Sequence, residues 1–185
     1  MTSDRIARVG ASETLRITAK AKELADQGID VIDLSVGEPD FPTPENVKRA
    51  GKLAIDRDFT KYTANPGIPE LRKAIAEKLK RDNHVEYGID EIIVSCGAKN
   101  CLYNFFMAVL NEGDEVIIPA PYWVSYPQQV LLAGGKPVIV ETREEDGFKL
   151  KPKDLEANIS FATKVLILNN PSNPTGTAYT KEELQ

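Results

Sequence analysis

The sequence of 185 residues is poor in the side chains that most often build metal and nucleophile sites. Its single histidine, His84, lies in the polar stretch KRDNHVEYG, which argues against a histidine-based catalytic triad and a multi-histidine metal site. The two cysteines, Cys96 and Cys101, follow no metal-ligand spacing, so we expect reduced thiols and no metal.

The sequence also lacks a basic block and a long apolar run. Its net charge is −5, so we expect no nucleic-acid partner. The longest apolar run, at residues 105–110, is far too short to span a bilayer, and the first ten residues contain no apolar signal-peptide core. We therefore expect a cytoplasmic protein that does not enter a membrane. Its length and its 42% hydrophobic content suit a globular domain with a sizeable core.

Strand-like and helix-like segments alternate along the chain. Apolar runs predict strands at a short segment from Val31 and at residues 91–95, 115–120, 136–143 and 164–169. Helical patterns predict helices at residues 15–28, 69–82, 98–113, 122–135 and 151–160. This alternation predicts an α/β fold with a mainly parallel sheet, and the continuous apolar runs predict strands that are buried on both faces.

The last residues carry a helix-start signal. Thr180 and Glu183 have the spacing of a capping box, and only five residues follow Thr180. Such a short helix does not hold on its own. We therefore expect the chain to be the front part of a longer protein.

Three unusual loops follow predicted strands, at the edge where parallel α/β sheets bind ligands. CGAKN (residues 96–100) opens a helix whose N–H groups attract an anion such as phosphate. PAPYWVSYP (residues 119–127) carries the only tryptophan, Trp123, whose ring could cover a flat aromatic ligand. NNPSNPTG (residues 169–176) could hold an amide donor in a fixed place.

Each loop also has an explanation without a ligand. The first could be a tight strand-to-helix turn, the second a core or interface aromatic, and the third an ordinary asparagine-rich turn. Together, an anion seat, a flat wall and an amide donor suit a planar, phosphorylated, heteroaromatic cofactor.

Four blocks of the sequence, in order, resemble the class I pyridoxal-phosphate-dependent aminotransferases, and most of all the bacterial aspartate aminotransferases. They are SVGEPDFPTP, KYTANPGIPELRKAIA, GAKNCLYNFFMAVLNEGDEVIIPAPYWVSYP and NNPSNPTG. The resemblance implies an incomplete three-layer α/β/α large domain of fold type I. Residues 1–43 would form an N-terminal arm and part of a small domain, and residues 44–185 the first part of the cofactor-binding large domain.

The resemblance implies pyridoxal phosphate as cofactor and transfer of an amino group between aspartate and a 2-oxo acid such as 2-oxoglutarate. It also implies a homodimer with shared active sites. The backbone N–H groups of Gly97, Ala98 and Lys99 would hold the cofactor phosphate, and Tyr62 would reach the phosphate of the neighbouring subunit. Trp123 would lie against the pyridine ring.

In the same resemblance, Asn173 would donate to the ring hydroxyl oxygen, and the Asn173–Pro174 peptide bond is expected to be cis. Gly37 would bind the substrate α-carboxylate, with Trp123 and Asn173 beside the substrate. Lys99 and Thr14 are candidates for its second carboxylate.

A solvated charge at a helix start is the other explanation of Lys99. The family's Schiff-base lysine, the aspartate at the pyridine nitrogen and the arginine that clamps the α-carboxylate are all expected beyond Gln185. We therefore expect no catalytic residue in this chain.

Other functions remain open at this point. The same fold could use prephenate, an aromatic 2-oxo acid or alanine, or could serve a lyase or synthase that depends on the same cofactor. A ligand-sensing domain of a transcription regulator is disfavoured, because no basic DNA-binding segment precedes the fold-like sequence. A complete but degenerate protein would lack the Schiff-base lysine and could not transaminate by this route.

Overall fold

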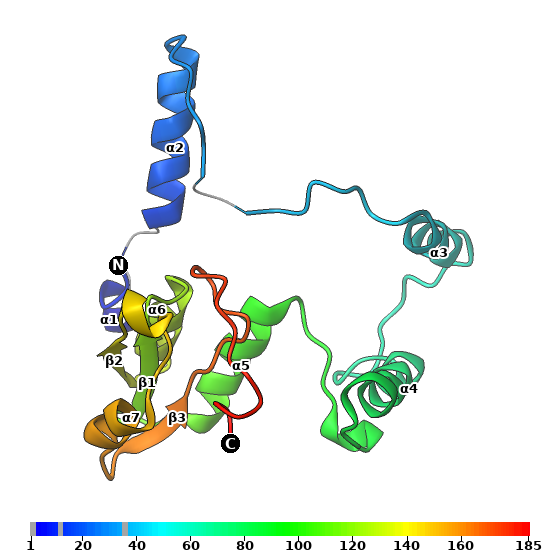
Figure 1. Ribbon diagram of the computed structural model, residues 1–185. Coiled ribbons are helices and arrows are strands. Elements are labelled where there is room, and N and C mark those ends of the chain that lie inside the picture. Colours follow the sequence, from blue (N-terminus) through cyan, green and yellow to red (C-terminus); the bar gives the residue numbers. More distant parts are fainter. Residues whose placement is uncertain (1–2, 11–12, 35–36) are drawn as a thin grey trace. The chain divides into compact units, whose positions relative to one another are not determined.

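The computed structural model describes residues 3–10, 13–34 and 37–185. The chain divides into two compact units, the first made of Met1–Asp33 and Leu102–Gln185 and the second of Leu34–Cys101. Figure 1 shows the helices and strands of both units.

A three-stranded parallel sheet forms the centre of the first unit. The strands β1 (Glu115–Ala120), β2 (Lys136–Glu141) and β3 (Thr163–Leu166) lie in the order β2-β1-β3. In the register, Ile117 of β1 pairs with Val138 on one side and Leu166 on the other. The predicted α/β fold with a parallel sheet is confirmed for the described residues.

Burial differs between the central strand and its neighbours. Val116, Ile117 and Ile118 of β1 are fully buried, as the continuous apolar run predicts. The same expectation is wrong for β3, which alternates between half-buried and exposed positions and leaves Leu166 39% exposed. Both β2 and β3 are edge strands, and β2 too is mostly half-buried, with Val140 as its buried residue. The two edges differ in cover, because α6 packs against β1 and β2, and α7 packs against β2.

The helices supply the rest of the core. The helical segments of the first unit are α1 (Asp4–Ala7), α2 (Glu13–Asp26), α5 (Ala98–Val109, from Leu102 onward), α6 (Ser125–Leu132), a 3-10 turn at Glu144–Asp146, and α7 (Pro152–Asn158). One apolar cluster joins α5 and α6 to β1, and its buried members are Phe106, Leu110, Val116, Ile118, Tyr126 and Val130. The helices α2, α5, α6 and α7 were predicted from the sequence, whereas the short α1 and the 3-10 turn were not.

A glycine pair ends α6 and leads directly into β2. Gly134 has φ +87°, a left-handed conformation that glycine adopts without steric cost. Its N–H donates to Leu131 O at 3.1 Å, and the N–H of Gly135 donates to Val130 O at 2.9 Å. These two bonds form a Schellman motif, which explains why the helix stops and the strand begins at Lys136.

The second unit is helical. It contains α3 (Glu45–Asp56), α4 (Pro69–Lys78) with Pro69 in its first turn, a π-helical turn at Leu79–Asn83 and a 3-10 turn at Ile89–Glu91. The predicted strand at residues 91–95 is wrong. Val94 N donates to Pro66 O at 3.0 Å, but the segment pairs with no strand in the described chain, and a strand needs a paired neighbour.

The predicted short strand from Val31 is likewise absent over residues 31–34, and residues 35–36 lie outside the described part of the chain. Among the helices that the structure describes, none is long and apolar enough to cross a membrane.

Candidate functional site

A pocket lies at the carboxyl ends of β1 and β3, the edge at which the sequence predicts a ligand site. It is lined by the end of β1, the start of α6, the segment that follows β3, and side chains of two further loops. Its polar and aromatic lining residues include Tyr122, Tyr126, Phe148, Asn169, Asn173 and Tyr179. The pocket encloses about 20 Å³, which is room for about one water molecule.

The asparagine-rich segment is held by its own side chains and backbone. Asn169 Oδ1 accepts a hydrogen bond from Asn173 N at 2.8 Å. Ser172 N donates to Thr177 O at 2.8 Å, and Gly176 N donates to Ser172 O at 2.8 Å, with φ +71° at Gly176. The loop that carries Asn173 is therefore tightly hydrogen-bonded.

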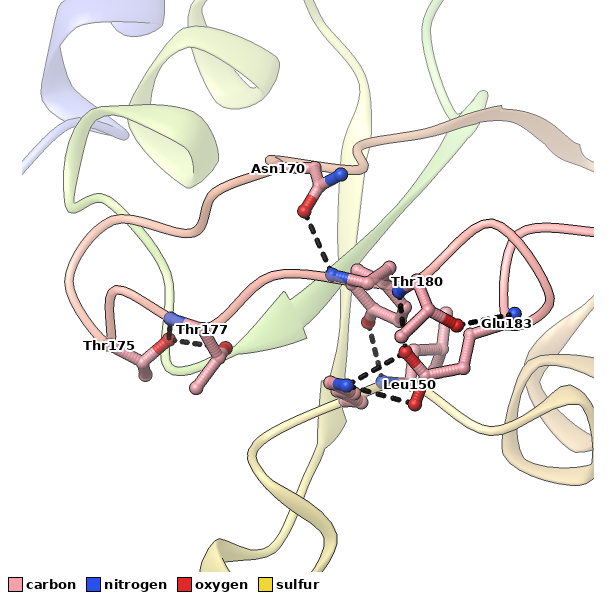
Figure 2. Close-up of polar contacts among 8 residues, drawn as sticks. Leu150, Asn170, Thr175, Thr177, Thr180 and Glu183 are labelled. Atoms are coloured by element: carbon pink, nitrogen blue, oxygen red, sulfur yellow. Dashed lines mark hydrogen bonds and ion pairs between the residues drawn. The ribbon is translucent and has the colours of Figure 1, made fainter.

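Two further contacts anchor the far end of this loop (Figure 2). Tyr179 N donates to Asn170 Oδ1 at 2.9 Å, and Leu150 N donates to the Tyr179 hydroxyl oxygen at 2.7 Å. The hydroxyl groups of Thr175 and Thr177 lie 2.9 Å apart within hydrogen-bonding distance. Tyr179 thus connects the loop to a segment 29 residues earlier in the chain.

The predicted capping box is confirmed next to Tyr179. Thr180 N donates to Glu183 Oε2 at 2.7 Å, and Glu183 N donates to Thr180 Oγ1 at 3.2 Å. Lys149 Nζ lies 2.7 Å from Glu183 Oε2 and 5.9 Å from the centroid of the Tyr179 ring. The hydrogen bond from Lys149, and then that from the Thr180 N–H, lower the pKa of Glu183 below its ordinary value.

Asn173 presents an amide at the pocket. It lines the pocket and is exposed, and within the described chain its side-chain amide makes no hydrogen bond. The Asn173–Pro174 peptide bond is cis, as expected; the Ala120–Pro121 and Asn170–Pro171 bonds are also cis. A side-chain amide held by a rigid backbone can donate to an oxygen of a ligand.

Trp123 packs against the apolar core of the first unit. It is half-buried beside the apolar cluster, and its ring meets that of Tyr126 edge-on, with centroids 5.3 Å apart at an angle of 85°. Its neighbour Tyr122 lines the pocket. Burial raises the pKa of Tyr126.

The predicted anion loop lies in the second unit. Gly97 is exposed with φ +82°, and its N–H donates to Ser95 O at 2.8 Å. Ala98 and Lys99 form the first turn of α5, where backbone N–H groups lack an acceptor within the helix. Gly97 O accepts hydrogen bonds from Asn100 N and Cys101 N, each at 3.1 Å, so the loop is bonded directly to the first turn of α5.

Three predicted residues belong neither to the pocket lining nor to the anion loop. Tyr62 is fully exposed. Gly37 is exposed too, and no heavy atom of the described chain lies within 4 Å of the position that a Cβ would take there. Thr14 belongs to α2, and its side chain lies outside what the structure describes.

Sequence reasoning missed the pocket residues Tyr122, Phe148 and Tyr179. Phe148 adopts φ +54°, directly after Gly147 at φ +65°. Only the glycine gives a sequence signal for a left-handed turn. The contacts of Tyr179 join residues distant in sequence, and no local pattern predicts them.

Comparison with known protein families gives one match that covers most of the chain. The sequence pattern of the family described as "Aminotransferase class I and II" matches residues 29–185. The aspartate/prephenate aminotransferase of Cereibacter sphaeroides is 59% identical over 182 residues, which are 98% of this chain and 46% of that protein. The aspartate aminotransferase of Bacillus subtilis is 54% identical over 180 residues, which are 97% of this chain and 46% of that protein.

Solved structures agree with these sequence matches. The aspartate aminotransferase of Rhizobium meliloti superposes with a TM-score of 0.95 at 49% identity, over 99% of this chain and 46% of that one. The Thermus thermophilus aspartate aminotransferase with maleate gives a TM-score of 0.94 at 48% identity, over 100% of this chain and 48% of that one. The chain thus spans about half the length of the curated relatives it matches.

Proposed function

The chain belongs to the class I and II aminotransferase family, and from this premise we propose that its gene product moves an amino group between aspartate and a 2-oxo acid such as 2-oxoglutarate. Pyridoxal phosphate is the proposed cofactor. The observation that carries the proposal is the Asn173 amide, which has no hydrogen-bond partner in the described chain and stands at the carboxyl edge of the parallel sheet.

The residues of this chain fit such a cofactor. A pyridine ring with a hydroxyl oxygen needs a donor, which Asn173 offers, and an aromatic neighbour, which Tyr122 or Trp123 offers. A phosphate needs backbone N–H groups, and Ala98 and Lys99 stand in the first turn of a twelve-residue helix. The pocket encloses only about 20 Å³, so it forms part of the proposed site and residues outside it must supply the rest.

The bound cofactor would supply an electron sink for loss of the substrate α-proton. In this proposal, Asn173 donates to the ring hydroxyl oxygen and stabilises its deprotonated form. Gly97, Ala98 and Lys99 hold the phosphate, for which the N–H of Gly97 must leave Ser95 O. None of these groups is proposed as the catalytic base, and the family's Schiff-base lysine, with its aspartate and arginine, is assigned to no residue of this chain.

A dicarboxylic substrate is the preferred choice. The relatives from Cereibacter sphaeroides and Bacillus subtilis are named for aspartate, and the Thermus thermophilus structure holds maleate, which has two carboxylates. We assign Lys99 and Thr14 to the second carboxylate and Gly37 to the first, with Trp123 and Asn173 beside the substrate. Prephenate is the second candidate, because the Cereibacter sphaeroides relative is also named for it.

The proposal extends to the assembly and location of the gene product. We propose a cytoplasmic homodimer with shared active sites, in which the fully exposed Tyr62 reaches the cofactor phosphate of the partner subunit. Residues 1–43 then form the N-terminal arm and part of a small domain, and residues 44–185 the first part of the large domain. Light scattering after size-exclusion chromatography measures the dimer directly, and a monomer would contradict it.

A substrate series tests the proposed function. The full-length gene product, loaded with pyridoxal phosphate, is assayed with aspartate, an aromatic amino acid or alanine as amino donor. The acceptors are 2-oxoglutarate and prephenate. We expect the highest kcat/KM with aspartate and 2-oxoglutarate. A rate with phenylalanine equal to that with aspartate would refute the aspartate assignment, and release of ammonia in step with oxo acid would indicate a lyase.

A further inference from the structure

Two sets of hydrogen bonds hold the loop that carries Asn173: bonds within the loop, and bonds made by Tyr179. Its inner bonds join Asn169 to Asn173 and Ser172 to both Gly176 and Thr177. These bonds set the shape of the loop, but they do not set its place over the pocket, because all their partners belong to the loop itself. Its placement needs contacts to the rest of the first unit.

Tyr179 provides such a contact. Its N–H closes the loop onto Asn170 Oδ1 at 2.9 Å, and its hydroxyl oxygen accepts from Leu150 N at 2.7 Å (Figure 2). Its side chain also lines the same pocket as Asn173. One residue therefore bonds to the first part of the loop with its backbone and to a separate segment with its side chain.

The segment that Tyr179 contacts is itself well held. Lys149, next to Leu150, pairs with Glu183 at 2.7 Å, and Glu183 caps Thr180, the residue after Tyr179. On the other side, Phe148 N donates to Arg143 O at 2.8 Å. Tyr179 is thus braced from both sides by interactions that do not depend on the loop.

We propose that Tyr179 is a positioning residue that fixes the Asn173 amide for the cofactor ring, through its bonds to Leu150 and Asn170. The inference rests on the proposed function, since it gives a purpose to the placement of Asn173. Tyr179 does not touch the cofactor in this proposal. Its effect on the cofactor passes entirely through the loop and Asn173.

The test compares Tyr179→Phe, which removes only the hydroxyl group, with Asn173→Ala and with the double variant in the full-length gene product. The readout is the pKa obtained from the absorbance of bound pyridoxal phosphate as pH is varied. Asn173→Ala is expected to raise this pKa, because it removes a donor to the deprotonated ring oxygen. Tyr179→Phe is expected to raise it by less, and to cause no further rise in the Asn173→Ala background.

Amide hydrogen exchange gives a second readout that does not depend on the cofactor. Tyr179→Phe should speed exchange at Leu150, which loses its acceptor, and at Asn173, by about fivefold or more. Tyr87→Phe is the matched control, because Tyr87 is exposed and makes no hydrogen bond in the described chain. Asn170→Ala is a second variant, which removes the acceptor of the Tyr179 N–H and leaves the bond from Leu150 N to Tyr179 in place. It should speed exchange at Asn173 without the direct loss of an acceptor at Leu150.

The outcomes separate the two claims. If Asn173→Ala shifts the pKa and Tyr179→Phe does not, or shifts it equally in both backgrounds, the positioning role is refuted while the proposed function stands. If Asn173→Ala leaves the pKa unchanged, the proposed role of Asn173 fails. The positioning claim is then decided by exchange at Asn173: a faster rate in Tyr179→Phe supports it, and an unchanged rate overturns it.

Discussion

Replacing Gly135 by alanine should destabilise the first unit, because the space beside this glycine is already filled. A Cβ at this position would lie 2.9 Å from Leu110 Cδ1, 3.0 Å from Val130 Cγ1 and 3.1 Å from Asp114 O. Leu110 and Val130 belong to the apolar cluster, and Asp114 O accepts a hydrogen bond from Lys136 N at 2.8 Å. None of the three neighbours can move without disturbing the core or the start of β2.

The expected cost follows from the type of contact. Inserting one methyl group into a packed core costs about 1–3 kcal/mol of unfolding free energy. At a denaturant slope of about 2 kcal/mol per molar urea the unfolding midpoint should fall by roughly 0.5–1.5 M, and by less at the steeper slope of a larger protein. The measurement is a urea titration of the full-length gene product followed by circular dichroism.

Gly51 provides the control for this substitution. It lies inside α3, and no heavy atom of the described chain comes within 4 Å of a built Cβ. Alanine there should stabilise the protein by roughly 0.5–1 kcal/mol, since glycine is a poor helix former. An unchanged or higher midpoint for Gly135→Ala, or equal losses for both variants, would refute the packing argument.

Three further predictions concern the core, the charges and the substrate. Phe106→Ala should cost about 3–5 kcal/mol, against less than about 1.5 kcal/mol for Phe106→Leu, as measured by the same urea titration; equal losses would contradict this. Hydrogen bonds from the Asn111 N–H and then from Lys164 lower the pKa of Asp114 below its ordinary 3.8. The stability that these bonds provide is therefore present above that pH and is lost below it, so the thermal midpoints of the wild type and Asp114→Asn should converge as pH falls below about 3.8. Midpoints that stay equally far apart at all pH values would contradict this role of Asp114. Lys99→Ala should raise KM for aspartate about tenfold or more and leave KM for phenylalanine unchanged, because only aspartate has a second carboxylate; an equal rise for both would remove Lys99 from substrate selection.

Local signals predicted several elements well. The strand β1 has the bounds that the run EVIIPA predicts, between Gly113 at φ +86° and the cis bond before Pro121. The helix start at Pro69 and the capping box at Thr180 were also found where residue type and spacing placed them. The helix signals depend on neighbours within a few residues, which is why the sequence is sufficient for them, whereas β1 also depends on its pairing with β2 and β3.

Other features depend on distant partners and could not be predicted. Residues 91–95 have the composition of a strand but pair with no strand in the described chain. The loop of Asn173 was predicted as rigid from its residue types, but its anchor at Leu150 is 29 residues from Tyr179. The half-buried packing of Trp123 on Tyr126 likewise depends on how α6 meets the core.

The most direct test of amino transfer follows the nitrogen atom itself. The full-length gene product, loaded with pyridoxal phosphate, is incubated with ¹⁵N-labelled aspartate and 2-oxoglutarate, and the products are analysed by mass spectrometry. The proposed function predicts ¹⁵N-labelled glutamate with an equal amount of oxaloacetate and no labelled ammonium. Label in ammonium, or unlabelled glutamate, would contradict it.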